Sequence, residues 1–209
     1  MHPLLDGFPR SVPVFPLAEV VLFPGALLPL HIFEKRYQAM VKDVLAGDKL
    51  IAMALLRECT KDEYEQRPPF HDTVCVGQVI HHEALPKGRS NIALLGLSAG
   101  RARPVDGPEP YRTARVDLLA DRFDADADFD RKLRQVFAEA VPGGGDIDGL
   151  REQLLEFLSE EDVPAALLNT CALTAPLQAS EKLELLETRS VSARLERLLE
   201  MLVRPWRWN

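Results

Sequence analysis

The sequence predicts an α+β protein in which a strand-rich part, residues 1–120, precedes an all-helical part, residues 121–209. Prolines break the apolar segment 14–37 into short extended pieces, and alternating apolar residues mark strands further along this first part. Beyond residue 129 the apolar residues recur every three or four positions, as they do in amphipathic helices. We expect the two parts to dock, because the helical faces carry more leucine than a small bundle needs for itself.

The N-terminal elements follow from the positions of glycine, proline and apolar residues. Pro24-Gly25 predicts a turn between two extended pieces. From about Phe33 the apolar period lengthens from two residues to nearly four, which predicts a helix that ends at Gly47. The apolar run 50–56 then predicts a strand that is covered on both faces.

Three further strands and a helical series complete the prediction. Residues 73–82 and 90–97 predict a hairpin, and residues 111–119 alternate as a strand with one solvated face. The acidic run 121–130 lacks the glutamate that closes a calcium-binding loop, so it is interpreted as a solvated linker. Apolar periodicity then predicts helices over 129–140, 147–158 and 165–173, and two more that begin near Ser180 and near Ser190 or Ser192.

Charge and hydropathy argue against nucleic-acid and membrane partners. Residues 1–120 hold 14 basic and 14 acidic side chains, whereas residues 121–209 hold 11 and 18, so the whole net charge of −7 lies in the second part. Phosphate-binding surfaces need clustered Lys and Arg, and the sequence has no such cluster. It also has no apolar run of bilayer length and no signal-peptide pattern, so we expect a cytoplasmic protein.

The cysteines and histidines predict no metal site and no cofactor. Cys59, Cys75 and Cys171 are far apart and form no C-x-x-C pair, which favours thiols in a reducing compartment over a disulfide or a zinc site. The run His81-His82-Glu83 lacks a third ligand at matching spacing, so a solvated strand end is the preferred interpretation.

No catalytic residues are predicted, and the chain is not expected to be an enzyme. It has no Gly-Lys pair of a phosphate-binding loop and no S-x-x-K pattern of a serine nucleophile. The one thiol pairing that we considered joins Cys75 to His71, His81 or His82. An apolar strand around Cys75 argues against it, because burial raises the pKa of a thiol.

The proline-broken segment and the helix after it carry a family pattern. The sequence resembles the N-terminal substrate-binding domain of the Lon protease family from about Val12 to Leu202. The residues at the family's spacing are Phe15, Pro16, Leu17, Phe23, Pro24, Gly25, Pro29, Phe33, Glu34, Arg36 and Tyr37. The resemblance implies a PUA-like β-pseudobarrel in residues 1–120 and a C-terminal α-helical bundle. It also implies a stand-alone form, because the protease's ATPase and peptidase domains have no counterpart in this sequence.

The resemblance implies a non-catalytic module that binds unfolded or tagged polypeptides. Such a module would act as an adaptor in protein quality control, and its second partner would be a protease or a chaperone. We expect an exposed apolar site with a polar rim at Leu27, Leu28, Tyr37 and Met40. The alternative that these side chains belong to the core stays open, most of all for Met40. Two other functions stay open: RNA binding, since PUA-like folds also bind RNA, and a small-molecule enzyme that uses the barrel mouth. The sequence makes no prediction of the oligomeric state.

Overall fold

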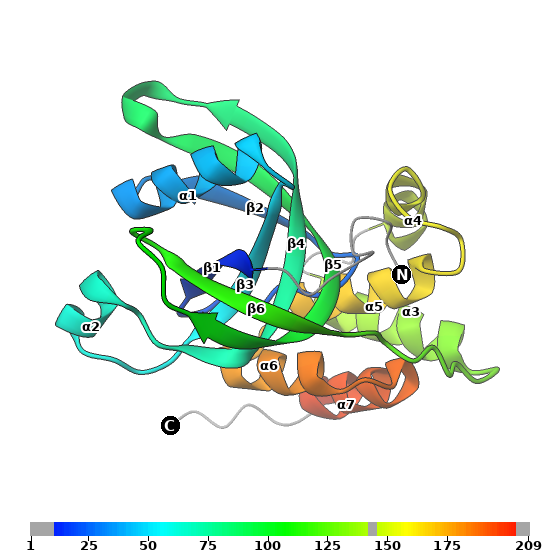
Figure 1. The fold of residues 1–209 in the computed structure, drawn as a ribbon. Helices are drawn as coiled ribbons and strands as arrows, with labels where there is room; N and C mark the ends of the chain where they lie inside the picture. The colour runs from blue at the N-terminus through cyan, green and yellow to red at the C-terminus, as the bar shows by residue number, and fades with distance from the viewer. Residues whose placement is uncertain (1–10, 142–145, 204–209) are drawn as a thin grey trace.

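A computed structural model describes residues 11–141 and 146–203 of the chain. Its strands are β1 (Ser11–Leu17), β2 (Leu27–Ile32), β3 (Leu50–Leu56), β4 (Phe70–Ala84), β5 (Ser90–Val105) and β6 (Arg112–Leu119). Its α-helices are α1 (Lys35–Ala46), α2 (Lys61–Gln66), α3 (Phe129–Ala140), α4 (Ile147–Leu155), α5 (Val163–Thr174), α6 (Ala179–Glu187) and α7 (Val191–Val203), and a 3₁₀ turn, η2 (Pro86–Gly88), joins β4 to β5. Helices α3 to α7 gather beside one side of the curled sheet, away from α1 and α2 (Figure 1). This arrangement confirms the predicted α+β class.

The sheet closes into a barrel and leaves β2 outside it. The strands follow the order β2-β5-β4-β3-β1-β6, and an additional pairing of β5 with β6 closes the ring. Strand β5 is long enough to change partner, because its residues 90–95 pair with β2 and its residues 99–105 pair with β6. In the described part of the chain β2 pairs with β5 alone, so it has one free edge.

Two apolar cores lie on the two faces of the barrel strands. Small and β-branched side chains such as Val14, Ala52 and Val116 fill the interior, as a narrow barrel requires. The outward-facing side chains, such as Met53 of β3, join a larger core that continues into the helices through Leu133 and Leu198. Both faces of β3 are therefore covered, as its apolar sequence predicts.

The predicted division at residue 120 stays a prediction. Strand β6 ends at Leu119 and helix α3 begins at Phe129, while the larger core includes residues from both sides of this boundary. Residues 1–10 and 204–209 of the predicted parts lie outside the described ranges. Among the described residues, no helix has the length and hydropathy needed to cross a bilayer.

Three local predictions need correction. Helix α1 begins at Lys35 instead of near Phe33, because Glu34 has extended backbone angles. Helix α2 was not predicted, since the segment 58–72 is polar and has no apolar period. Helix α4 ends at Leu155, short of the predicted residue 158, and Phe157 beyond it is 44% exposed.

Candidate functional site

Strand β2 places Leu27 and Leu28 at the free edge of the sheet. Leu27 is 37% exposed, whereas Leu28 is half-buried against the larger core. The N–H of Gly96 donates to the carbonyl of Ala26, so in this antiparallel register the outward main-chain groups belong to Leu27, Pro29 and His31. Proline has no N–H, and Pro29 therefore limits how far this edge can pair with another strand.

The structure does not place all four predicted binding residues on one exposed surface. Met40 is fully buried and Tyr37 is 3% exposed, because both lie on the inward face of α1. The expectation that these two side chains form an exposed apolar surface with Leu27 and Leu28 is wrong. Met40 belongs to the core, while Tyr37 forms part of the wall of a cavity.

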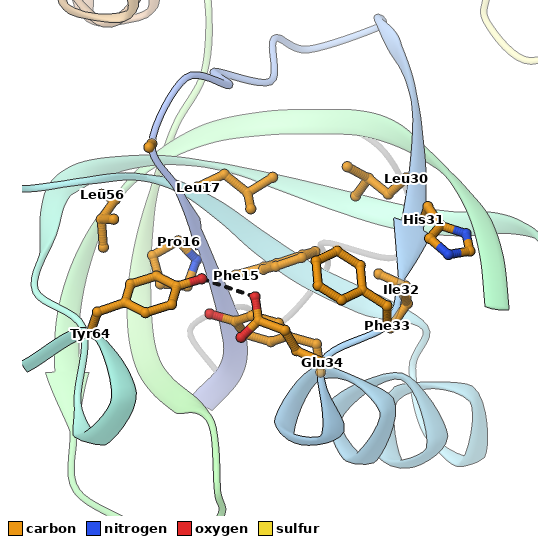
Figure 2. Close-up of a pocket in the computed structure, with 12 residues that line it drawn as sticks. Phe15, Pro16, Leu17, Leu30, His31, Ile32, Phe33, Glu34, Leu56 and Tyr64 are labelled. Carbon is orange, nitrogen blue, oxygen red and sulfur yellow. Dashed lines mark hydrogen bonds between the residues drawn. The ribbon is translucent and has the colours of Figure 1, made fainter. Parts of the chain in front are cut away.

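This cavity, which we call the edge cavity, has a volume of about 390 Å³ and lies between β1, β2, the end of β3, and helices α1 and α2. Its walls include Phe15, Leu17, Leu30, Phe33, Glu34, Tyr37 and Tyr64. Figure 2 shows Leu17 and Leu30 at one end and Glu34 with Tyr64 at the other, with the Phe15 and Phe33 rings between them. The cavity is thus apolar along most of its length and polar at one end.

Six residues of the family pattern meet at the edge cavity, although they are spread over 23 positions of sequence. They are Phe15, Pro16, Leu17, Phe33, Glu34 and Tyr37. Strand β1 supplies the first three, the segment that joins β2 to α1 supplies Phe33 and Glu34, and α1 supplies Tyr37. Phe15 and Tyr37 also contact each other, with ring centroids 4.3 Å apart. The pattern therefore describes one wall of a cavity as well as a run of core positions.

The polar end of the edge cavity holds a compact ion pair. Glu34 Oε2 accepts a hydrogen bond from Arg36 Nε at 3.1 Å, and Glu34 Oε1 accepts one from the Tyr64 hydroxyl at 2.9 Å. The Arg36 guanidinium lies 4.7 Å from the Tyr37 ring centroid and 4.4 Å from that of Tyr64, a cation–π arrangement. Charge is thus balanced within the protein at this end.

The pKa shifts at this end have identifiable causes. Burial lowers the pKa of Arg36, but the interactions with Tyr37, Glu34 and Tyr64 outweigh it and raise that pKa overall. Burial, followed by the hydrogen bond to Glu34, raises the pKa of Tyr64. Arg36 and Tyr64 therefore keep their protons in the physiological range.

An exposed aromatic ring lies at the rim of the edge cavity. Phe33 is 62% exposed, and its ring is stacked with that of His31 at a centroid distance of 6.2 Å. The sequence pattern had assigned Phe33 to the buried stripe of a helix. Tyr64 was also missed, although Thr60 and Glu63 form a capping box, a readable signal for the short helix that carries it.

A second cavity, which we call the junction cavity, lies where the sheet meets the helices. Its volume is about 510 Å³, and its walls include Pro24, Gly25, Gly96, Asp121, Phe157 and Asn169. Gly25 has φ of +75°, and a Cβ atom there would lie 2.5 Å from the Ala166 Cβ atom, so the turn packs directly on α5. Pro24 and Gly25, which belong to the same family pattern, thus lie at the contact between this turn and α5.

A buried arginine donates hydrogen bonds to the polar groups of the junction cavity. Arg194 is fully buried; its Nη1 and Nη2 atoms each donate to a carboxylate oxygen of Asp121 at 2.7 Å. Nη1 also donates to Asn169 Oδ1 at 2.7 Å, and the remaining N–H groups donate to the carbonyls of Leu185 and Thr188. Every donor of this guanidinium has a partner.

Two of the three thiols, Cys75 and Cys171, are buried. Burial raises the pKa of Cys75, with a smaller contribution from Asp121, and burial also raises the pKa of Cys171 to about 12. Both side chains therefore stay protonated at neutral pH. Across the ranges 11–141 and 146–203, no three His, Cys, Asp or Glu side chains gather in a way that could hold a metal ion.

Known proteins resemble this chain along nearly all of its length. The family model described as the ATP-dependent protease La (LON) substrate-binding domain matches residues 11–204. The Lon protease of Dictyoglomus thermophilum is 26% identical over 203 residues, 95% of this chain and 25% of that protein. The Lon protease of Escherichia coli K12 is 25% identical over 195 residues, 92% of this chain and 24% of that protein. The chain therefore spans about a quarter of the length of these relatives.

Two solved structures share the fold. The N-terminal domain of the Mycobacterium avium complex Lon protease superposes with a TM-score of 0.59 at 16% identity, over 92% of this chain and 98% of that one. A Lon N-terminal domain protein from Xanthomonas campestris also gives 0.59, at 23% identity, over 91% and 98%. At these identities the structures establish the fold, and the family model establishes descent: the chain belongs to the family of LON substrate-binding domains.

Proposed function

We propose that the protein is a non-catalytic module of the cytoplasm that binds exposed apolar segments of polypeptides and acts as an adaptor in protein quality control. The observation that carries the proposal is the pair of exposed apolar side chains, Leu27 and Phe33, at the two ends of β2, beside a cavity lined by the family's own residues. An apolar surface of this kind next to a free sheet edge suits an extended segment of polypeptide.

The size of the surface predicts weak binding. Each anchor side chain that becomes buried contributes roughly 1.5 to 3 kcal/mol, and ordering a flexible client costs part of this. Two or three anchors therefore give a Kd on the order of micromolar to millimolar. Such an affinity suits a protein that samples many sequences.

The experiment that tests the proposal measures binding of a reduced, carboxymethylated and fluorescently labelled unfolded protein by anisotropy. We expect Leu27→Ser and Phe33→Ser each to weaken binding several-fold and to leave the melting temperature nearly unchanged, because both side chains are exposed. Leu28→Ser should weaken binding and also lower stability, since Leu28 packs partly against the core.

Two exposed residues of the helical part and its linker are matched controls. Leu155 is 41% exposed and Phe123 is 53% exposed, close to the values of Leu27 and Phe33. Leu155→Ser and Phe123→Ser should leave the affinity unchanged. Equal losses in all four variants would show nonspecific adhesion, and unchanged affinity in Leu27→Ser and Phe33→Ser would place the site elsewhere.

RNA binding and catalysis are the competing functions. The acidic balance of the chain predicts no salt-sensitive binding of a single-stranded RNA near physiological ionic strength. Submicromolar affinity with a steep salt dependence would favour RNA over polypeptide. ATP hydrolysis or peptide cleavage that a point substitution abolishes would contradict a non-catalytic module.

A further inference from the structure

A small pocket lies at the end of the barrel where β4 and β6 begin, and we call it the mouth pocket. Its volume is about 60 Å³, roughly twice the volume that one water molecule occupies in the liquid. Its walls come from α1, from the residues before β4, and from the start of β6 with the residues before it. They include three arginines, Arg36, Arg67 and Arg112, and one carboxylate, that of Glu109. The pocket therefore has room for one small charged group.

Two of the three arginines already have acceptors. Arg36 donates to Glu34, with which it forms an ion pair. Arg67 donates to Asp106 and, at 3.1 Å, to the carbonyl of Gly107. The charges of Arg36 and Arg67 are thus balanced by carboxylates of the protein itself.

Arg112 has no acceptor of its own. Among the described residues, none accepts a hydrogen bond from its guanidinium or forms an ion pair with it, and its Nε atom is buried. The guanidinium lies 5.5 Å from the centroid of the Phe70 ring, at the end of the apolar barrel interior. Of its three nitrogens only Nε is buried, so the terminal Nη1 and Nη2 atoms stay accessible to a ligand.

The surroundings of Arg112 favour an anion. Burial, followed by the like charge of Arg67, lowers the pKa of Arg112, and Asp106 offsets this only in part. A bound anion would counter both effects, because it would replace lost solvation and balance a second positive charge. Glu109 lies on the same wall but forms no hydrogen bond or ion pair with Arg112.

The size of the pocket and its charge narrow the choice of anion. One unpaired guanidinium matches a group with one negative charge, and its two Nη atoms match the two oxygens of a carboxylate. A phosphate monoester carries nearly two negative charges at neutral pH and would face Glu109 at the same wall. A polypeptide supplies carboxylates at its C-terminus and at Asp and Glu side chains.

We propose that Arg112 binds a carboxylate of the client polypeptide at the mouth of the barrel, through its Nη1 and Nη2 atoms. This inference rests on the proposed function for the source of the carboxylate, and it adds an ionic contact to the apolar ones. Glu109 opposes the bound carboxylate, since both groups are negative and lie at the same wall.

The test compares three peptides by NMR titration of the ¹⁵N-labelled protein. The first, acetyl-Ser-Leu-Ala-Leu-Ala, ends in a free carboxylate, the second is the same sequence as a C-terminal amide, and the third is the amide with Asp in place of the central Ala. We expect the first or the third to bind about three- to tenfold more tightly than the second. An advantage of the first assigns the site to the C-terminus, and one of the third assigns it to a side chain.

Two arginines on one strand make matched variants. Arg112 shares the inward face of β6 with Ala114, whereas Arg115 is exposed on the opposite face. In Arg112→Gln the advantage of the carboxylate peptides should disappear, and in Arg115→Gln, the same change of charge, it should persist. Equal losses in both variants would show a general attraction by charge and would overturn the proposal, as would an advantage that survives in Arg112→Gln.

Glu109→Gln should act in the opposite direction. It removes a negative charge from the wall of the mouth pocket, so we expect the advantage of the carboxylate peptides to grow by about twofold. Glu109 is exposed, and its replacement should leave the fold intact. Glu139→Gln, at an exposed position of α3, is the control and should change nothing. An advantage that shrinks in Glu109→Gln would contradict the proposal.

The guanidinium gives a direct readout that needs no peptide. The Nε–H of Arg112 is buried, so it is expected to exchange slowly with water, and its signal is identified by its absence from the spectrum of Arg112→Gln. Sodium acetate should shift this signal, and sodium chloride at the same ionic strength should not. If Arg112→Gln does not fold, Arg112→Lys identifies the signal in the same way. A signal that acetate leaves in place would overturn the proposal.

The outcomes also distinguish this inference from the proposed function. If the unfolded protein binds through Leu27 and Phe33 while a carboxylate gives no advantage and acetate no shift, the inference fails and the proposed function stands. A phosphoserine peptide that binds more tightly than the Asp peptide would overturn the choice of a carboxylate. If neither the unfolded protein nor any peptide binds, the proposed function itself fails, whatever acetate does.

Discussion

The two cavities differ in how their polar groups are satisfied. In the junction cavity, Asp121 and Asn169 are both bonded to Arg194, and the Asn169 amide also donates to the Pro24 carbonyl at 2.8 Å. At the edge cavity, Glu34 is bonded to Arg36 and Tyr64, and Phe33 at the rim is largely exposed. The junction cavity therefore lies at a contact between the sheet and the helices whose polar groups are tied together, whereas the edge cavity has an exposed ring at its rim.

The largest expected effect follows the loss of Arg194. Arg194→Met would leave Asp121 and Asn169 without their buried partner, and we expect a loss of about 3–5 kcal/mol in the free energy of unfolding. Urea denaturation measures it. Arg197→Met, on the exposed face of the same helix, is the matched control and should change the midpoint little.

The buried Arg194 also connects the strand-rich part to the helical part, so the two parts are expected to unfold together. Arg194 of α7 joins Asp121, just after the last strand, to the helices, and the larger core spans both sides. We expect calorimetry of the wild type to give one cooperative transition. Two separate transitions would show that the junction does not couple the strand-rich and helical parts.

A smaller effect is expected at Gly96, where β5 changes partner. A Cβ atom there would lie 2.0 Å from the Phe23 carbonyl oxygen, so Gly96→Ala forces the 23–26 segment to move and should cost about 1–3 kcal/mol. Gly47→Ala is the control, since the nearest atom to its Cβ would be 3.6 Å away. Equal midpoints for the two variants would mean that the contact at Gly96 is not a constraint.

The smallest effect concerns the buried thiols and alkaline pH. Unfolded cysteine has a pKa of about 8.5, whereas burial raises the pKa of Cys171 to about 12 and raises that of Cys75 as well. Below about pH 8.5 both states hold the thiol protons and this stabilisation is fully present. Above it the unfolded state releases them first, so stability falls as the pH rises towards the folded value.

The loss of stability that the two buried thiols cause at alkaline pH can be separated from the loss that other titrating groups cause. The double variant Cys75→Ala/Cys171→Ala should lose less of its urea midpoint between pH 7.5 and pH 9.5 than the wild type does. In the native wild type, a thiol reagent should label Cys59, which is partly exposed, and spare the two buried thiols. Rapid labelling of all three would contradict their burial.

Local patterns predicted the core of the fold and part of the candidate site. The stripe of α1 is buried at Tyr37, Val41 and Val44, because a helical period is a property of neighbouring residues. Phe33 fits the same period by coincidence, since Glu34 is extended and the helix has not yet begun. The pattern thus assigned the most exposed ring of the site to the core, whereas the separate prediction of a binding surface included Met40, which is buried.

Contacts between distant residues were beyond prediction from one sequence. Asp121 lies 73 positions from Arg194, and Asn169 lies 25 positions from it. Nothing near any of the three residues marks them as partners. Nearby sequence likewise does not mark the contact between Tyr64 and Glu34, which lie 30 positions apart. Such groups meet through the closure of the barrel and the docking of the helices, which local sequence does not encode.

The turn at Pro24-Gly25 has a mechanical consequence. It precedes β2 directly, and it is fastened by the Gly25 N–H to the Gly96 carbonyl at 2.8 Å, by the Gly96 N–H to the Ala26 carbonyl at 3.0 Å, and by Asn169 to the Pro24 carbonyl. A free edge strand can ordinarily be peeled away from its first residue. Tension applied to β2 would here load three hydrogen bonds, one of them to α5, before the strand could separate. The strand most open to solvent is thus anchored at its beginning, and a pull on it is shared by the sheet and the helices.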